Sequence, residues 1–153
     1  MAIRVVIIAL QTIHASIPGV VSAPLVYPNA INTNDLPMML TFPGQGTSSQ
    51  EAMNSLRRQD RTYLVRGYVD PISQGIRDEK IQQTITLLQL CIEAYINPDN
   101  IRLVDQGGLH ATIKISAATP VTDTGLAVLP YGPPALQQGY HGFEIQLGVY
   151  EKW

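Results

Sequence analysis

The sequence predicts an α+β domain, with one mostly antiparallel sheet of about four strands flanked by an N-terminal helix and one long amphipathic helix. Residues 61–71 alternate like a strand. Tyr63, Val65 and Val69 share one face of that strand. Residues 76–96 repeat apolar side chains at three- and four-residue steps, which is the period of a helix. A strand that leads into a long helix is the expected nucleus of the fold.

Length and composition favour a single domain, residues 1–153, with its own core. A chain of this length buries roughly 70% of its unfolded surface. Hydrophobic residues make up 45% of the chain, a normal globular share, but charged residues only 14%, well below the usual quarter or so. A charge-poor chain suggests that much of its surface meets other protein. The formal net charge of −2 argues against specific nucleic-acid binding, which calls for a basic patch.

The N-terminal stretch is predicted to be an amphipathic helix over residues 2–16, although its β-branched content leaves a strand over 3–9 as an alternative. Pro18-Gly19 ends it. The apolar run resembles a signal peptide but is too short to span a bilayer, so we expect a buried first element of a protein made in the cytoplasm. The predicted apolar stripe consists of Ile3, Val6, Ile7, Leu10 and Ile13.

The other strands are expected at residues 36–42, 109–116 and 140–151. The last of these alternates most clearly, because apolar residues fill every second position from 143 to 149. Its inward residues are predicted to be Phe143, Ile145, Leu147 and Val149, and those of the 109–116 strand are Leu109, Ala111, Ile113 and Ile115.

Two segments are predicted to project from the sheet, residues 44–60 and 117–138. The first is polar without a period, which indicates a hairpin arm or loop between two antiparallel strands. The second is rich in Pro and Gly, with a short strand over 125–129 as an option. Residues 17–37 form a further proline-rich, extended segment.

The long helix is expected to end near Asn97-Pro98, because a residue before proline disfavours helical geometry. Cys91, the one cysteine, lies on its apolar side and is interpreted as a small core residue. The predicted buried stripe is Ile81, Ile85, Leu88, Ile92 and Tyr95, with Thr84 and Cys91 beside it.

The sequence contains no catalytic, phosphate-binding or metal-binding motif, so we expect neither an enzyme nor a cofactor. The three histidines do not form a short-spaced pair. His110 and His141 lie on different predicted strands and could be neighbours. A small ligand-binding or enzymatic domain, with a pocket formed by His110, His141 and Glu144, is the alternative from another class.

The one basic cluster contains Arg57, Arg58 and Arg61, diluted by Asp60. It is either a solvated strand edge, where arginine discourages stray pairing, or a patch for an acidic partner surface. The proline-rich stretches add tyrosine, methionine and leucine where a monomer would prefer charge, and aromatic residues and methionine are enriched in interfaces. Each of these residues could instead fold back on the core. The candidate subunit or partner interface is Tyr27, Met38, Met39, Arg57, Arg58, Arg61, Tyr131, Leu136 and Tyr140.

The order of elements resembles the tail terminator proteins of long-tailed bacteriophages, of the kind that caps a lambda-type tail tube. The resemblance lies in the helix that ends at Pro18-Gly19, the strands 36–42, 61–69 and 140–150, and the polar segment between the first two strands. It covers most of the chain as an order of elements.

This resemblance implies a structural virion protein that forms a hexameric ring, caps the tail tube and ends tail elongation. Its partners would be further copies of itself, the tail tube protein and the head-side connector, with no membrane and no specific nucleic acid. It would be found in the virion, at the tail or neck, after assembly in the host cytoplasm. Residues 44–60 would correspond to the family's projecting segment, which contacts neighbouring subunits or the tube. A head-completion or neck adaptor protein is the nearest alternative.

Overall fold

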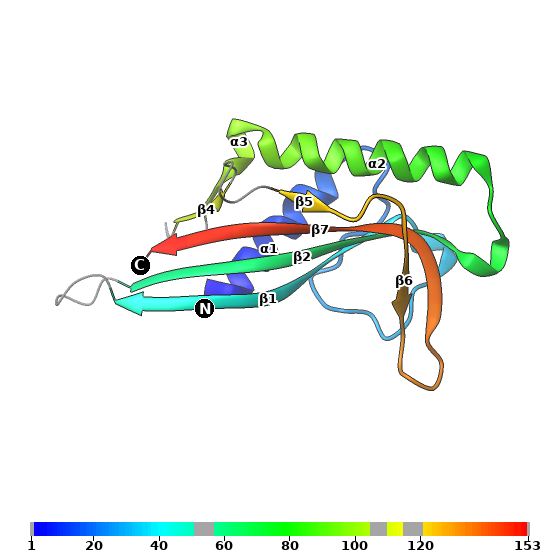
Figure 1. Cartoon of the computed structure of the whole chain (residues 1–153), viewed down its shortest axis with the longest axis horizontal. Helices are drawn as coiled ribbons and strands as arrows, with labels where there is room; N and C mark the ends of the chain where they lie inside the picture. The colour runs from blue at the N-terminus through cyan, green and yellow to red at the C-terminus, as the bar shows by residue number, and fades with distance from the viewer. Residues whose placement is uncertain (1, 51–56, 105–109, 115–120, 153) are drawn as a thin grey trace.

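The computed structural model describes residues 2–50, 57–104, 110–114 and 121–152. Two helices and three long strands dominate it (Figure 1). These are α1 (Ala2–Ser16), β1 (Met38–Gln50), β2 (Arg57–Pro71), α2 (Asp78–Ile96) and β7 (Gln138–Lys152). The short elements are η1 (Thr33–Asp35), η2 (Ile72–Gln74), α3 (Pro98–Ile101), β3 (Arg102–Val104), β4 (His110–Lys114), β5 (Thr122–Asp123) and β6 (Ala127–Tyr131).

The strands form one antiparallel sheet in the order β1-β2-β7-β4-β3, which confirms the predicted α+β class. Strand β7 pairs with β2 on one side over almost its whole length. On its other side β7 pairs in succession with β6, β5 and β4. The described strands outnumber the predicted four because β3 and β5, with three and two residues, are too short to show an alternating pattern.

The predicted projecting segment 44–60 is mainly strand. Strand β1 extends to Gln50, and β2 begins at Arg57 and pairs with it from there. The hairpin-arm interpretation is therefore correct, whereas a loop over 44–50 and 57–60 is wrong. Both strands are polar here because the arm extends past the apolar core, so no alternation appears in the sequence. Residues 51–56 lie outside the described part of the chain.

The predicted irregular segment 117–138 also contains strands. The strand foreseen at 125–129 is present as β6, shifted by two residues, and β5 precedes it. Residues 115–120 lie outside the described part of the chain. The segment is therefore tied to β7 along part of its length rather than projecting throughout.

The main core lies between the sheet and the two helices, with α1 behind the sheet and α2 along its upper margin in Figure 1. The N-terminal stretch is helical, so the strand alternative over residues 3–9 is wrong. All four inward residues predicted for β7 are buried. They pack with Tyr63, Val65 and Val6 in one cluster. This burial supplies most of the hydrophobic stabilisation, because the free energy scales with apolar area removed from water.

A second, smaller core lies on the other face of the sheet. Met38 and Leu40 of β1 and Tyr68 of β2 pack there against Leu129 of β6 and Tyr140 of β7. Strand β1 therefore has both faces covered at its start, and its side chains are buried in both directions from Met38 to Thr41. The sequence analysis did not foresee this second core.

The buried face of α2 differs from the predicted stripe. The side chains buried at the helix–sheet interface are Thr84, Leu87, Cys91 and Tyr95. Ile85, predicted to be central, is 43% exposed. Thr84 is tolerated inside because its Oγ1 donates to the carbonyl of Lys80 at 2.7 Å, so its hydroxyl is not left unpaired. The prediction is therefore confirmed for Thr84, Cys91 and Tyr95, whereas it wrongly included Ile85 and missed Leu87.

Replacing Leu87 with Ala should lower the free energy of unfolding by about 2–5 kcal/mol. The Leu87 side chain is 3% exposed, so its truncation would leave a cavity in the core. Ile85→Ala should cost under about 1 kcal/mol, since much of that side chain is already in water. Urea unfolding of both variants measures the difference. Equal losses would show that α2 is rotated relative to the sheet.

Candidate functional site

Three predicted interface residues lie in the core instead, namely Met38, Met39 and Tyr140, which are 2%, 0% and 3% exposed. Met39 packs into the main core, whereas Met38 and Tyr140 pack into the second one. The prediction took Met38 and Tyr140 for surface residues because it lacked the second core, and it missed that Met39 faces the main core. Their side chains cannot meet a partner while the domain is folded.

Tyr27 and Tyr131 form hydrogen bonds that link the proline-rich segment 17–37 to the sheet. The Tyr27 hydroxyl donates to the Thr41 carbonyl at 2.5 Å, and its ring stacks on Phe42 with the centroids 4.9 Å apart. The Tyr131 hydroxyl donates to the Pro28 carbonyl. Both therefore pack against their own chain, although Tyr27 remains 43% exposed and available to a partner.

Of the predicted basic cluster, the structure describes the side chain of Arg61. Arg61 donates from Nη1 to the Gly44 carbonyl at 2.8 Å, so it links β2 to the bulge in β1. Arg57 and Arg58 lie at the start of β2, and their side chains lie outside what the structure describes. Because β2 lies between β1 and β7, Arg61 does not protect a strand edge, and its guanidinium bonds a carbonyl of its own chain instead.

Leu136 is the predicted interface residue that stands out most fully, at 75% exposed. It lies in the connection between β6 and β7, which extends away from the rest of the molecule (Figure 1). Its backbone N–H donates to the Pro133 carbonyl at 2.8 Å, so the turn is held locally. An ordered, uncharged loop with an exposed leucine is a suitable partner contact.

The alternative pocket of His110, His141 and Glu144 does not form. His110 pairs with Lys152 at one end of β7, whereas His141 pairs with Asp70 near the other. The strands thus hold the two histidines apart.

Glu144 is occupied by a different interaction. Its Oε2 accepts from Arg66 Nε at 2.7 Å, and the Arg66 guanidinium lies 5.5 Å from the centroid of the Phe42 ring. The Glu144 carboxylate therefore forms an ion pair with Arg66 on the face of the sheet. In the described part of the chain, no three His, Cys, Asp or Glu side chains gather as metal ligands would.

A buried polar cluster joins α1, α2 and β1, and the sequence analysis missed it. Gln11 Oε1 accepts from Thr41 Oγ1 at 2.9 Å and from His14 Nδ1 at 2.8 Å. Gln11 Nε2 donates to the Met39 carbonyl at 2.8 Å. The Tyr95 hydroxyl then donates to His14 Nε2 across 2.5 Å. These partners require a neutral imidazole with its proton on Nδ1.

Burial lowers the pKa of His14 to about 3 and raises the pKa of Tyr95 well above its usual value. Both groups are thus neutral in the folded protein. Cys91, also on the buried face of α2, has its pKa raised to about 12 by burial. A thiol held in this form is a poor nucleophile, which agrees with its interpretation as a core residue.

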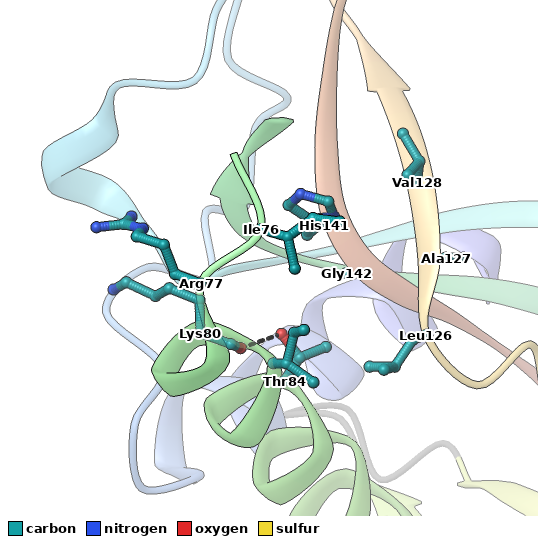
Figure 2. A pocket seen from close by; sticks show the side chains of 10 residues that line it. Ile76, Arg77, Lys80, Thr84, Leu126, Ala127, Val128, His141 and Gly142 are labelled. Carbon is teal, nitrogen blue, oxygen red and sulfur yellow. Dashed lines mark hydrogen bonds between the residues drawn. The ribbon is translucent and has the colours of Figure 1, made fainter. Parts of the chain in front are cut away.

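A cavity of about 260 Å³ opens between the first two turns of α2 and strands β6 and β7. Figure 2 shows His141 and Ile76 at its centre with Leu126 and Val128 opposite. The side chains of Arg77 and Lys80 extend to the left in this view, away from Leu126 and Val128. Its lining is mostly apolar and includes no carboxylate. Of its apolar side chains, Ile76 is 80% exposed, so this hollow is suited to receiving an apolar group.

Further apolar side chains are exposed after α1. Val21 and Val26 are 60% and 71% exposed, in the extended segment that runs beside the start of β1. Ile72, 44% exposed, follows the same end of β2, because the start of β1 pairs with Tyr68. Exposed apolar surface commonly marks a protein contact where it is contiguous.

Comparisons with known proteins assign no family. No protein-family model matches the chain, and no curated protein matches it by sequence. Within the described residues, no helix has both the length and the apolar character needed to cross a membrane.

The buried His14 should make stability depend on acidity. Its pKa is near 6.5 when unfolded and about 3 when folded, so only the unfolded chain takes up a proton between these values. The contribution of the neutral His14 to the free energy of unfolding is thus retained above pH 6.5. Between pH 6 and 4 this free energy should fall by up to about 1.4 kcal/mol per pH unit.

Carboxylates also titrate between pH 6 and 4. The contribution of His14 is therefore isolated by comparing the pH dependence of the original protein with that of the His14→Gln variant. This variant should be less stable at neutral pH, but its stability should fall less steeply between pH 6 and 4. Urea unfolding at several pH values measures both slopes. Parallel slopes would mean that His14 gains its proton without unfolding.

Proposed function

We propose that the chain is a structural virion protein that forms a ring on the phage tail tube, ends tail elongation and provides the surface that joins the tail to the head connector. The proposal joins the resemblance in the order of elements to the surface properties of this fold. It takes the protein to be non-enzymatic, with further copies of itself, the tube protein and the connector as partners.

The observation that carries the proposal is the outer edge of β1. This strand has no charged residue over its 13 positions, Met38–Gln50. Near its start, the Met39 N–H donates to the Ser22 carbonyl at 2.9 Å, and Gln11 and Tyr27 bind the next outward carbonyls. Beyond Pro43, among the described residues, no further strand pairs with β1 on the side away from β2.

A long edge strand without charge is a site for pairing with another chain. Natural monomers commonly protect such an edge with lysine or cover it. Here the start of the β1 edge is covered, and its distal part, residues 44–50, is left without charge. A ring of identical subunits gives this arm a partner in every copy, because each subunit contributes two different surfaces to its two neighbours.

The test is the mass of the purified chain in solution, followed by electron microscopy with and without purified tail tubes. Closed rings, or a monomer that becomes a ring at the tube end, would support the proposal. Rings that bind head connectors but leave tubes free would favour the neck adaptor. A chain that stays monomeric and leaves tube ends uncapped would refute both.

Leu136→Asp should impair assembly without unfolding the domain, because the side chain is already 75% exposed. Binding to tubes should weaken about tenfold or more if Leu136 enters a partner surface. The control is Gln137→Asp, which adds the same charge at the neighbouring exposed position. Equal effects of both changes would indicate a response to charge rather than a contact of Leu136.

A further inference from the structure

The bulge between Pro43 and Gly46 divides the outer edge of β1 into two parts. Before the bulge, main-chain groups of Met39 and Thr41 point away from β2 and are bonded by groups from α1 and from the segment 17–37. The residues between them bond β2, since bonding alternates along an antiparallel pair. Pro43, the next outward residue, has no N–H to donate. Up to the bulge, the edge therefore offers little to an added strand.

Beyond the bulge, the outward main-chain groups are left open. In β2, the even-numbered residues from 64 to 68 bond β1, and the odd-numbered residues bond β7. After the register shift, the β1 residues opposite odd-numbered positions of β2 are Gly46, Ser48 and Gln50. Their N–H and C=O groups therefore point away from β2. Among the described residues, no strand pairs with them on that side, and we call them the open edge.

The open edge is the longest unpaired strand edge in the described part of the chain. Strands β3 and β5 also have one neighbour each, but they contain three and two residues. Strand β6 pairs with β7 alone, and it contains Pro130, which removes a main-chain donor. Unpaired main-chain groups in a row bind another extended strand, so the chemistry of this edge calls for a strand.

We propose that the open edge pairs antiparallel with the open edge of a second copy of this chain, with the two-fold axis at Ser48. Ser48 then lies opposite Ser48 of the second copy, and Gly46 lies opposite Gln50. Each such pair exchanges two hydrogen bonds, so every main-chain group of the open edge gains a partner. Centring the pair on Thr47 instead would leave the groups of Gln50 outside this pairing.

The absence of charge favours a second copy as the occupant. Two identical antiparallel strands are related by a two-fold axis, so a charged residue near the axis would meet its own kind. Like charges opposite each other destabilise a strand pair. Strand β1 contains no charged residue over its 13 positions. The exposed residues 47–49 carry hydroxyl groups, which form favourable cross-strand pairs with each other.

This inference goes beyond the proposed function, because it concerns the free chain. The pair covers the same edge that the ring contact would use. A subunit therefore forms either the pair or the ring contact. Pairing protects the edge from other strands while the chain is away from the tube.

The first experiment is oxidative cross-linking of the full chain with Ser48→Cys. The Cα atoms of a hydrogen-bonded pair lie about 5.5 Å apart, which a disulfide spans. The native Cys91 is buried and does not compete. The matched control is Thr47→Cys, whose two copies would be diagonal neighbours about 7–8 Å apart, beyond the usual disulfide range. We expect Ser48→Cys to form disulfide-linked dimers at least about tenfold faster than Thr47→Cys.

Equal rates for the two cysteine variants would indicate random collision and overturn the inference. Faster linking of Thr47→Cys would overturn the register centred on Ser48.

The second experiment is sedimentation of the original chain, Ser48→Pro and Ser48→Ala over a range of concentrations. Proline removes the outward N–H and is tolerated in an edge strand, so the domain should remain folded while dimerisation weakens about tenfold or more. Alanine removes the hydroxyl group but keeps the main chain, so dimerisation should be unchanged. Thermal unfolding of both variants checks that the domain is intact.

An original chain that sediments as a monomer at every concentration would overturn the inference. Electron microscopy with tail tubes separates this outcome from failure of the proposed function. Rings at tube ends, formed by a chain that is monomeric in solution, would retain the ring and discard the pair. Dimers linked through Ser48→Cys that leave tube ends uncapped even after reduction, together with an original chain that never caps them, would retain the pair and discard the ring.

Discussion

The pairing of β2 with β7 is the constraint on which the rest of the structure depends. These two inner strands run together from Arg58 and Lys152 to Pro71 and Tyr140. Their odd-numbered side chains form the floor of the main core, and β1, β6, β5 and β4 are all aligned on them. Because a shift by one residue would exchange the two faces, the register from Arg58 to Tyr68 determines which side chains are buried over that length, and it shifts between Tyr68 and Asp70.

The buried polar cluster makes the helix packing specific. Apolar contacts alone would tolerate small slides of α1 against α2, since the hydrophobic effect has no direction. Gln11 and His14 instead join α1 to β1 and to Tyr95 through hydrogen bonds with defined partners. An imidazole that must remain neutral fits only where both ring nitrogens are satisfied, so each misplacement leaves a buried polar group unpaired.

The sequence predicted the elements whose pattern is local. The alternation of β7 and the stripe of α1 were read correctly, because one face of each meets the core. The face of α2 was predicted in part: Thr84, Cys91 and Tyr95 are buried as expected, whereas Leu87 is buried and Ile85 is exposed, because apolar residues at helical spacing lie on more than one side of this helix. Met38 and Tyr140 were misassigned because β6 folds over the second face of the sheet, and that contact joins residues distant in sequence. The cavity was missed for the same reason.

A low content of charge has a structural consequence in this fold. With both faces of β1 covered at its start and its outer edge partly capped, an uncharged strand edge remains over residues 44–50, and exposed apolar side chains remain at Val21 and Val26, in the β6–β7 connection at Leu136, and beside the two ends of α2 at Ile76 and Ile96. These surfaces point in different directions, so a single two-fold contact could not cover them all. Several unlike contacts per subunit are what the proposed ring would require, since each copy would then meet two neighbours and a partner on each side.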